Sequence, residues 1–289
     1  MVHSYLSTTG GIRAKPRICA VSYLNTAPLV WGLLHGPQKG AAEVSFAIPS
    51  ECARRVVGGE ADLGIVPVIE MDRHGLQPVS ELCIACRGEV RSILLFSRRP
   101  WAEVKTLAAD IGSRTSVELA RVVLKERFGV SPSVQAMRPE LGTMLSAADA
   151  ALLIGDAALA VDPERTGLEY LDLGQAWFGL TGLPMVFAVW AGRPGAAPAG
   201  LDAVLEGSFS YGKASLDAII KSEAESRGFS RELVARYFER NVTFHLGDAE
   251  RAGLEAFLAA ARALDGARGA REGIADDDAE RSRRAVPQR

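Results

Sequence analysis

Short apolar segments alternate with amphipathic ones along the first third of the chain. Apolar runs of five or six residues fit buried strands, and the stretches between them have apolar positions at helical spacing. This pattern predicts strands over residues 17–22, 43–48 and 61–66, with an apolar helix through Leu34 after the first. Ser50 is expected to cap a second helix that ends at Gly58 and Gly59. Strand and helix in alternation predict a parallel sheet with helices on its faces.

The middle of the chain continues this alternation. Residues 92–96 and 151–154 are predicted strands, and a strong helix is expected from Ser116 to Phe128, ending at Gly129. The strand over residues 186–190 is expected to return to the first sheet. We therefore predict two lobes. Their expected limits are a flexible N-terminus over 1–16, a first lobe over 17–97 plus 187–265, a second lobe over 98–186, and a disordered charged tail over 266–289.

Composition and charge narrow the class of protein. The 289 residues are 48% hydrophobic and carry a net charge of -2, which is ordinary for a globular protein and does not suggest a nucleic-acid partner. No apolar run is long enough to span a membrane, and the N-terminus lacks the apolar segment of a secretory signal, so we expect a cytoplasmic protein. The four cysteines are expected to be free thiols. Cys83 and Cys86 form a C-x-x-C without a second ligand pair, so we expect no metal and interpret them as part of an apolar strand.

Polar clusters follow or precede the predicted elements at three places. They are residues 22–26, 113–116 and 155–156. Open parallel sheets bind ligands beyond the carboxyl ends of their strands, so these clusters are candidates for one cleft. In the first, Asn25 can donate and accept hydrogen bonds, although a simple turn explains it equally well. No nucleotide-binding glycine pattern or nucleophile elbow occurs in the sequence.

The other two clusters each have more than one interpretation. Thr115 and Glu118 fit a capping box, and the same helix N-terminus could bind a carboxylate through its free N–H groups. Asp156 is a candidate binding residue, a general acid or base, or a helix cap. Ser92, at the start of an apolar strand, carries little information alone. These alternatives stay open on the residues themselves.

Six segments together resemble one known family. They are VSYLNTAPL, GEADLGIVPVIE, VRSILLFS, SRTSVELARVVL, LLIGDAAL and DLGQAWFGLTGLPMVFAVWA, spread over residues 17–191, with weaker similarity to about residue 257. In this order they are similar to the chorismate dehydratases of the futalosine route to menaquinone. The segment around Ile111 and Gly112 departs from the short polar turn of the family pattern.

The resemblance implies a fold, an activity and a set of residues. The implied fold is the type II periplasmic-binding-protein fold, an α/β fold of two lobes with a ligand cleft between them. The implied reaction removes water from chorismate to give 3-[(1-carboxyvinyl)oxy]benzoate, without cofactor or metal. Asn25 and Ser92 are the implied catalytic residues, Asn25 bonding the departing hydroxyl and Ser92 a carboxylate or the ether. The expected substrate-binding residues are Tyr23, Thr26, Thr115, Ser116, Gly155 and Asp156.

The proton-accepting base and two other functions stay open at this point. A substrate carboxylate could take the proton, because the matching motifs contain no histidine or lysine; Asp156 is the alternative base. The naphthoate-forming sister lyase of the same pathway would share the lobes. A non-enzymatic solute-binding or sensor protein would share them too, but this chain shows neither an export signal nor room for a helix-turn-helix before residue 17. The sequence does not determine the oligomeric state.

Overall fold

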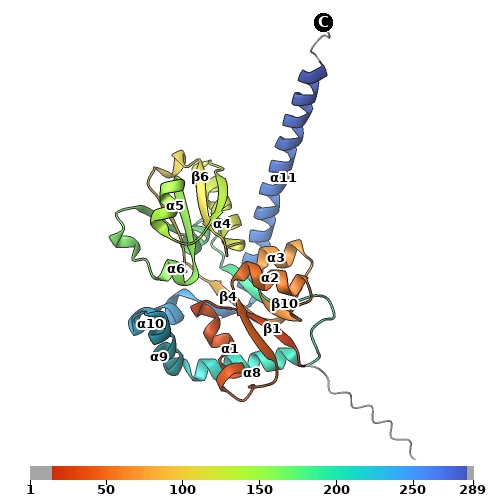
Figure 1. Cartoon of the computed structure of the whole chain (residues 1–289), viewed down its shortest axis with the longest axis vertical. Coiled ribbons are helices and arrows are strands. Elements are labelled where there is room, and N and C mark those ends of the chain that lie inside the picture. Colours follow the sequence, from red (N-terminus) through yellow and green to blue (C-terminus); the bar gives the residue numbers. More distant parts are fainter. Residues whose placement is uncertain (1–14, 285–289) are drawn as a thin grey trace, which may run out of the picture.

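The computed structural model describes the backbone of residues 15–284 and the side chains of residues 15–266. Its strands form two separate sheets, one in each of two lobes (Figure 1). The expected two-lobed α/β fold is therefore confirmed. The first sheet consists of β1 (Arg17–Val21), β2 (Glu43–Ala47), β3 (Leu63–Pro67), β4 (Gln77–Cys86), β10 (Met185–Gly192) and β11 (Thr243–His245). The second consists of β5 (Ile93–Ser97), β6 (Thr106–Asp110), β7 (Ser133–Met137), β8 (Ala150–Ile154) and β9 (Glu169–Asp172).

The first sheet is mixed, in the order β11-β4-β10-β3-β1-β2. Strands β1, β2 and β3 pair in parallel, as the alternating pattern predicts. Strand β10 lies antiparallel between β3 and β4, and every residue of β10 is buried. The predicted return of the chain through this strand is confirmed, and its antiparallel direction is a feature that the alternating pattern of the first three strands does not address. A strand that enters directly from the other lobe needs no crossover helix, so it can pair antiparallel.

The second sheet has the order β7-β6-β8-β5-β9 and corrects one lobe boundary. Strand β5 pairs antiparallel with β8 and β9, so residues 93–97 belong to the second lobe rather than to the first. The chain crosses between the sheets over residues 87–92 and returns over residues 182–184. The apolar sequence of a strand does not show which sheet the strand joins, because both sheets bury their strands equally well.

The helices cover the two sheets. The first-lobe helices are α1 (Ala27–His35), α2 (Pro49–Val57), α3 (Val68–Arg73), α8 (Leu201–Ala214), α9 (Leu216–Arg227) and α10 (Arg231–Arg236). Helices α4 (Thr115–Phe128), α5 (Leu141–Ala147), α6 (Gly155–Leu159) and α7 (Leu173–Thr181) belong to the second lobe. Helices α1 and α8 approach closely, since a Cβ at Gly212 would lie 2.1 Å from the carbonyl oxygen of Pro28. Three shorter turns are η1 (Leu24–Thr26), η2 (Trp101–Glu103) and η3 (Pro163–Arg165), and η4 (Tyr237–Asn241) is a π-helix.

Two predicted helix caps are wrong. Helix α2 begins at Pro49, and its N-cap is Ile48 instead of Ser50. Helix α4 begins at Thr115 after Arg114, and no side chain caps it. The Thr115 hydroxyl donates to the carbonyl of Phe187, and Glu118 pairs with Arg73 and Arg121 at 2.9 Å each. Phe187 and Arg73 of the first lobe, together with Arg121 of α4 itself, bond the groups that a local capping box would use.

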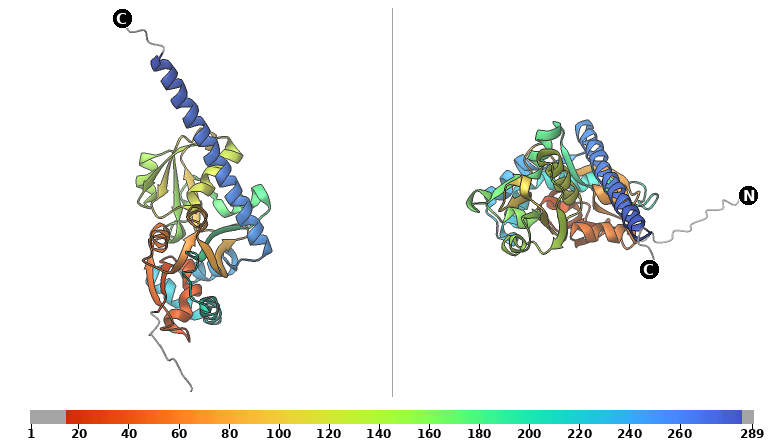
Figure 2. Two further views of the ribbon diagram at one scale, coloured as in Figure 1. Left: turned by 90° about the vertical axis from the view of Figure 1, so that its right-hand side faces the viewer. Right: turned by 90° about the horizontal axis from the view of Figure 1, so that it is seen from above.

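The C-terminal segment is helical up to Arg284, which corrects the expected disordered tail over these residues; residues 285–289 lie outside the described residues. Helix α11 runs over Asp248–Arg284; its first part packs against β10, α3 and α4, and its end extends beyond the lobes (Figure 2). Its later residues are rich in alanine, arginine and glutamate, which have high helix propensity even where no apolar face is available for packing. The lack of large apolar residues in this segment indicates that it does not join a core, but it does not exclude a helix. The predicted flexible N-terminus falls mostly on residues 1–14, which lie outside the described residues.

Within the described residues, no helix is both long and apolar enough to cross a membrane. All four cysteines are free and buried. Burial raises the pKa of both Cys83 and Cys86, which lie in the core of the first lobe. The C-x-x-C is thus part of the apolar strand β4, as its surroundings in the sequence predict.

Candidate functional site

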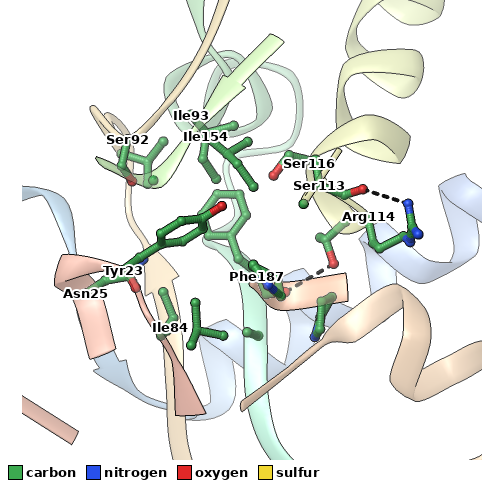
Figure 3. Close-up of a pocket in the computed structure, with 18 residues that line it drawn as sticks. Tyr23, Asn25, Ile84, Ser92, Ile93, Ser113, Arg114, Ser116, Ile154 and Phe187 are labelled. Carbon is green, nitrogen blue, oxygen red and sulfur yellow. Dashed lines mark hydrogen bonds between the residues drawn. The ribbon is translucent and has the colours of Figure 1, made fainter. Parts of the chain in front are cut away.

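The candidate site is a pocket between the lobes, at the ends of strands from both sheets (Figure 3). Most of its wall is apolar. Among the described residues that line the pocket, one has a charged side chain, Arg114. The polar groups sit at two ends of this wall. The apolar lining residues are Val21, Pro49, Pro67, Ile84, Val90, Ile93, Ile154, Phe187 and Ala188.

Asn25 and Ser92 form one polar end of the pocket. Asn25 lies in η1, directly after β1, and Ser92 ends the crossover that leads into β5. Both line the pocket, although Ser92 is only 1% exposed. The Asn25 Oδ1 atom is buried and has no hydrogen-bond partner within the described residues. A buried amide oxygen without a partner is costly, so it is suited to accept a hydrogen bond from a ligand.

The crossover residue before Ser92 fixes the position of this serine. Arg91 has φ +61°, the left-handed region that non-glycine residues rarely adopt. Its N–H donates to Asp172 at 2.6 Å, and its guanidinium donates to the carbonyls of Ala158 at 3.0 Å and Val161 at 2.6 Å. Asp172 also accepts from the N–H of Val90. These bonds hold the strained turn, and the turn directs Ser92 to the pocket.

Tyr23 spans the pocket from the first lobe to the second. A Cβ at Gly155 would lie 2.6 Å from the Tyr23 ring, and one at Gly112 would lie 3.1 Å from its hydroxyl. Gly155 also has φ +58°, so glycine is required there for two reasons. Burial, with Asp110 and Asp156 nearby, raises the pKa of Tyr23, so the phenol stays protonated and can donate. In Figure 3 its ring stands between Asn25 and Ser92 on one side and Ser113 and Ser116 on the other.

The start of α4 forms the second polar end. Ser113 and Ser116 line the pocket and are almost fully buried, and Ser113 Oγ has no partner among the described side and main chains. The first N–H groups of an α-helix have no partner within the helix and attract anions. Arg114 lies at the same end, with its Nε 3.9 Å from Glu70. This end combines a cation, hydroxyls and helix N–H groups, which suits a carboxylate.

Asp110 lies behind this end and supports the loop that forms it. Its Oδ1 accepts from the Gly112 N–H at 2.9 Å, and the Ser113 N–H donates to its carbonyl at 2.8 Å. Burial raises the pKa of Asp110, and the hydrogen bond from the Gly112 N–H opposes this only in part. Its Oδ2 is buried without a partner within residues 15–266. Asp110 is therefore a structural carboxyl that holds the loop before α4.

The pocket brings together six of the eight residues expected from the sequence. Thr26 and Asp156 are the two that do not line it. Thr26 lines a neighbouring cavity on the side of α1. Asp156 accepts from the Leu24 N–H at 2.9 Å and pairs with Arg227 of α9, so it links the two lobes. The six that line the pocket are Tyr23, Asn25, Ser92, Thr115, Ser116 and Gly155.

The sequence placed Ser113 and Arg114 in a polar cluster but did not identify them as substrate-binding residues, and it gave no indication that Tyr237 contacts the site. The Tyr237 hydroxyl donates to Ser92 Oγ at 2.9 Å. Tyr237 follows Ser92 by 145 residues, and no local pattern reports such a distant contact. Arg114 had a signal, because it is the basic residue beside a predicted helix N-terminus. No group of three or more histidine, cysteine or carboxylate side chains in the described part of the chain is arranged to hold a metal.

The fold and pocket define a class of protein, the two-lobed binding-protein fold with a ligand pocket between its lobes. A crystal structure of a protein from Archaeoglobus fulgidus matches 88% of this chain and 99% of its own, with a TM-score of 0.71 and 16% identity. The periplasmic aliphatic sulphonate binding protein of Escherichia coli matches 88% of this chain and 87% of its own, with a TM-score of 0.58 and 17% identity. At these identities the likeness establishes the fold alone.

The sequence defines the family more closely. Residues 16–263 match the profile of the menaquinone biosynthesis family. A protein of Thermus thermophilus called chorismate dehydratase is 33% identical over 258 residues, which are 82% of this chain and 92% of that protein. The chain belongs to the menaquinone biosynthesis family.

Proposed function

We propose that this chain is a chorismate dehydratase, a carbon-oxygen lyase that acts in the cytoplasm on a small-molecule substrate and needs no cofactor. The observation that carries the proposal is the division of one apolar pocket into two polar ends, Asn25 with Ser92 and Arg114 with Ser113 and Ser116. Chorismate has an apolar ring edge and two carboxylates, so its chemistry complements this pocket. The name of the Thermus thermophilus relative supports the same substrate.

The reaction removes a ring hydroxyl and a proton from the neighbouring carbon that bears the ether. The electrons of the broken C–H bond form a ring double bond, the C–O bond breaks, and hydroxide and proton leave as water. The aromatic product makes this strongly favourable. The protein must hold two carboxylates, direct one proton away and stabilise a departing hydroxide.

The two ends of the pocket divide these tasks. The end at Ser113, Arg114 and Ser116 binds one carboxylate through hydroxyls, a guanidinium and the first N–H groups of α4. Asn25 and Ser92, which lie at the other end, bond the departing hydroxyl and the ether region. The apolar walls exclude water, which strengthens each of these hydrogen bonds.

A carboxylate of the substrate serves as the base. Within residues 15–266, no histidine, lysine, aspartate or glutamate lines the pocket. Asp156, the protein alternative, is engaged by Leu24 and Arg227. A carboxylate that is held close to the proton acts at high effective concentration, so a modest base is sufficient.

The test is to incubate the purified, metal-free protein with chorismate and follow product by mass and ultraviolet absorbance. Loss of one water with appearance of the substituted benzoate is the expected result. A parallel incubation with the cyclic futalosine substrate tests the sister lyase. Turnover of that substrate alone, or binding of chorismate without turnover, would overturn the proposal.

Alanine at Asn25 or Ser92 provides the matching residue test. Each of Asn25→Ala and Ser92→Ala is expected to lower kcat by roughly 10²-fold or more, the size seen when one stabilising hydrogen bond to a developing charge is lost. Ser146→Ala, on the exposed side of α5, is the matched control and should retain full activity. Unchanged kcat in both site variants would remove these residues from the mechanism.

A further inference from the structure

Tyr237 is a buried phenol that the chemistry above does not use. It is 1% exposed and lies in the π-helix η4, in a cluster with Leu24, Ile219 and Phe238. It does not line the pocket. Its hydroxyl donates to Ser92 Oγ at 2.9 Å, so its one polar atom touches a residue of the proposed catalytic pair.

The π-helix holds the crossover segment at two points. Asn241, at its other end, donates through Nδ2 to the carbonyl of Glu89 at 3.1 Å. Tyr237 therefore contacts Ser92 while Asn241 contacts Glu89, and both contacts fall within the crossover of residues 87–92. Inserting a π-helix turn changes the direction of the side chains that follow, and such turns recur at functional sites.

The contact determines what the Ser92 hydroxyl can do. A serine hydroxyl has one proton to donate and two lone pairs that accept. Because Ser92 Oγ accepts from Tyr237, its own proton is free, and it has no acceptor among the described protein atoms. Ser92 lines the pocket, so this proton is available to a ligand there. Burial raises the pKa of Tyr237, and this keeps the phenol protonated as the donor.

We propose that Tyr237 is a positioning residue that orients the Ser92 hydroxyl, so that Ser92 donates its proton to the substrate's departing oxygen or ether. This inference rests on the proposed function. Tyr237 does not line the pocket, so it acts through Ser92, with Asn25 as a second polar neighbour of its hydroxyl. A tyrosine that merely filled the core would need no hydroxyl at this point, since phenylalanine packs equally well against Leu24 and Phe238.

Kinetics of Tyr237→Phe separate positioning from packing. The variant keeps the ring and should remain folded, with only a small fall in unfolding temperature from the loss of one buried hydrogen bond. We expect kcat to fall roughly tenfold with KM within twofold, because only the orientation of Ser92 is lost. In the Ser92→Ala background the same substitution should have no further effect on kcat, since the oriented group is absent. Tyr170→Phe, on β9, removes a hydroxyl that is bonded to Glu164; it is the matched control and should change neither constant.

A second measurement needs no substrate. The chain has five tyrosines, so tyrosine labelled with ¹³C at Cζ gives a spectrum that tyrosine-to-phenylalanine variants can assign. Ser92→Ala should shift the Tyr237 signal, because its acceptor is lost, and leave that of Tyr170 unchanged.

The outcomes distinguish this inference from the proposed function. The positioning role would be overturned if the double variant lost the product of the two single-variant losses in kcat. It would also be overturned if Ser92→Ala left the Tyr237 signal unchanged. If Ser92→Ala shifts the Tyr237 signal but the wild type does not dehydrate chorismate, the proposed function is refuted, while the contact of Tyr237 with Ser92 stands.

Discussion

At the scale of single residues, the site depends on polar groups whose partners are incomplete. Asn25 Oδ1, Ser113 Oγ and Asp110 Oδ2 are buried, and none has a hydrogen-bond partner within residues 15–266. Such groups reduce stability, because burial removes their water without replacing it. At Asn25 and Ser113 the unsatisfied atoms belong to residues that line the pocket, so a ligand can satisfy them. Asp110 is different, because it stands behind the pocket wall.

Asp110 gives the protein a predictable response to pH. Burial raises its pKa in the folded state above the unfolded value of about 3.9. The folded state then holds the proton more tightly, so this contribution to stability is present below the unfolded pKa and is lost as pH rises through the folded pKa. Asp110→Asn removes the ionising group and with it this loss of stability. The free energy of unfolding of the variant should therefore fall less than that of the wild type as pH is raised from 4.

Urea unfolding of both proteins at a series of pH values measures this. Glu103→Gln, in the turn η2, provides a control for the loss of one carboxylate elsewhere. Parallel pH profiles for Asp110→Asn and the wild type would show that this carboxyl has no raised pKa.

At the scale of elements, helix α11 joins parts of the molecule that are distant in sequence. It packs against β10 and also contacts α3 and α4. Phe257 of α11 meets the ring of Trp177 edge-on, with the ring centroids 6.0 Å apart. Trp177 in turn donates to the carbonyl of Pro184, in the returning crossover. The helix thus supports the second connection between the lobes from behind.

Two glycines of α11 allow a matched test of this packing. A Cβ at Gly253 would lie 2.0 Å from the Pro184 carbonyl oxygen, whereas a Cβ at Gly266 meets nothing within 4 Å. Gly253→Ala should therefore destabilise the protein by about 1–3 kcal/mol through overpacking. Gly266→Ala should stabilise it by about 0.5–1 kcal/mol, because alanine is the better helix former.

Thermal or urea unfolding of the two variants measures the difference in sign. Equal effects of the two substitutions would show that α11 does not approach Pro184 as closely as the structure has it.

At the scale of the whole molecule, a few contacts hold the two lobes together around the pocket. Tyr23 of the first lobe packs on Gly155 of the second. Asp156 of the second lobe pairs with Arg227 and bonds the Leu24 N–H. Thr115 bonds Phe187 across the same boundary. Hinge closure around a ligand is a common motion of two-lobed folds, and these contacts cross the boundary that such a motion would open.

Asp156→Asn tests the closure and the identity of the base together. Asparagine can still accept from Leu24 but loses the charge that pairs with Arg227. A partly exposed ion pair contributes up to about 1 kcal/mol, so KM should rise by at most roughly fivefold. Because Asp156 does not line the pocket, kcat should stay within about threefold of the wild type.

Steady-state kinetics and small-angle scattering without substrate measure the two effects. Glu223→Gln removes the other partner of Arg227 within the first lobe and serves as the control. Loss of turnover in Asp156→Asn with unchanged substrate affinity would make Asp156 the base and end the case for substrate assistance.

The sequence by itself determined the elements and the parts of the site next to them in the chain. Apolar periodicity located β1, α1, β8 and α4, and the clusters after β1 and before α4 supplied Asn25 and Ser116. These are local properties, since a residue's spacing and its place at the end of an element are visible in a short window. The family segments added Ser92, which its local sequence alone does not distinguish.

Only the tertiary structure decided which sheet each strand joins and which groups meet. Strand β5 is as apolar as its neighbours, and its place in the second sheet follows from pairing with β8 and β9. Thr115 fits a capping pattern, yet Phe187 takes its hydroxyl. The contact of Tyr237 with Ser92 joins residues 145 positions apart. Long-range packing chooses among partners that local sequence leaves equivalent, so these features become visible only once the chain is folded.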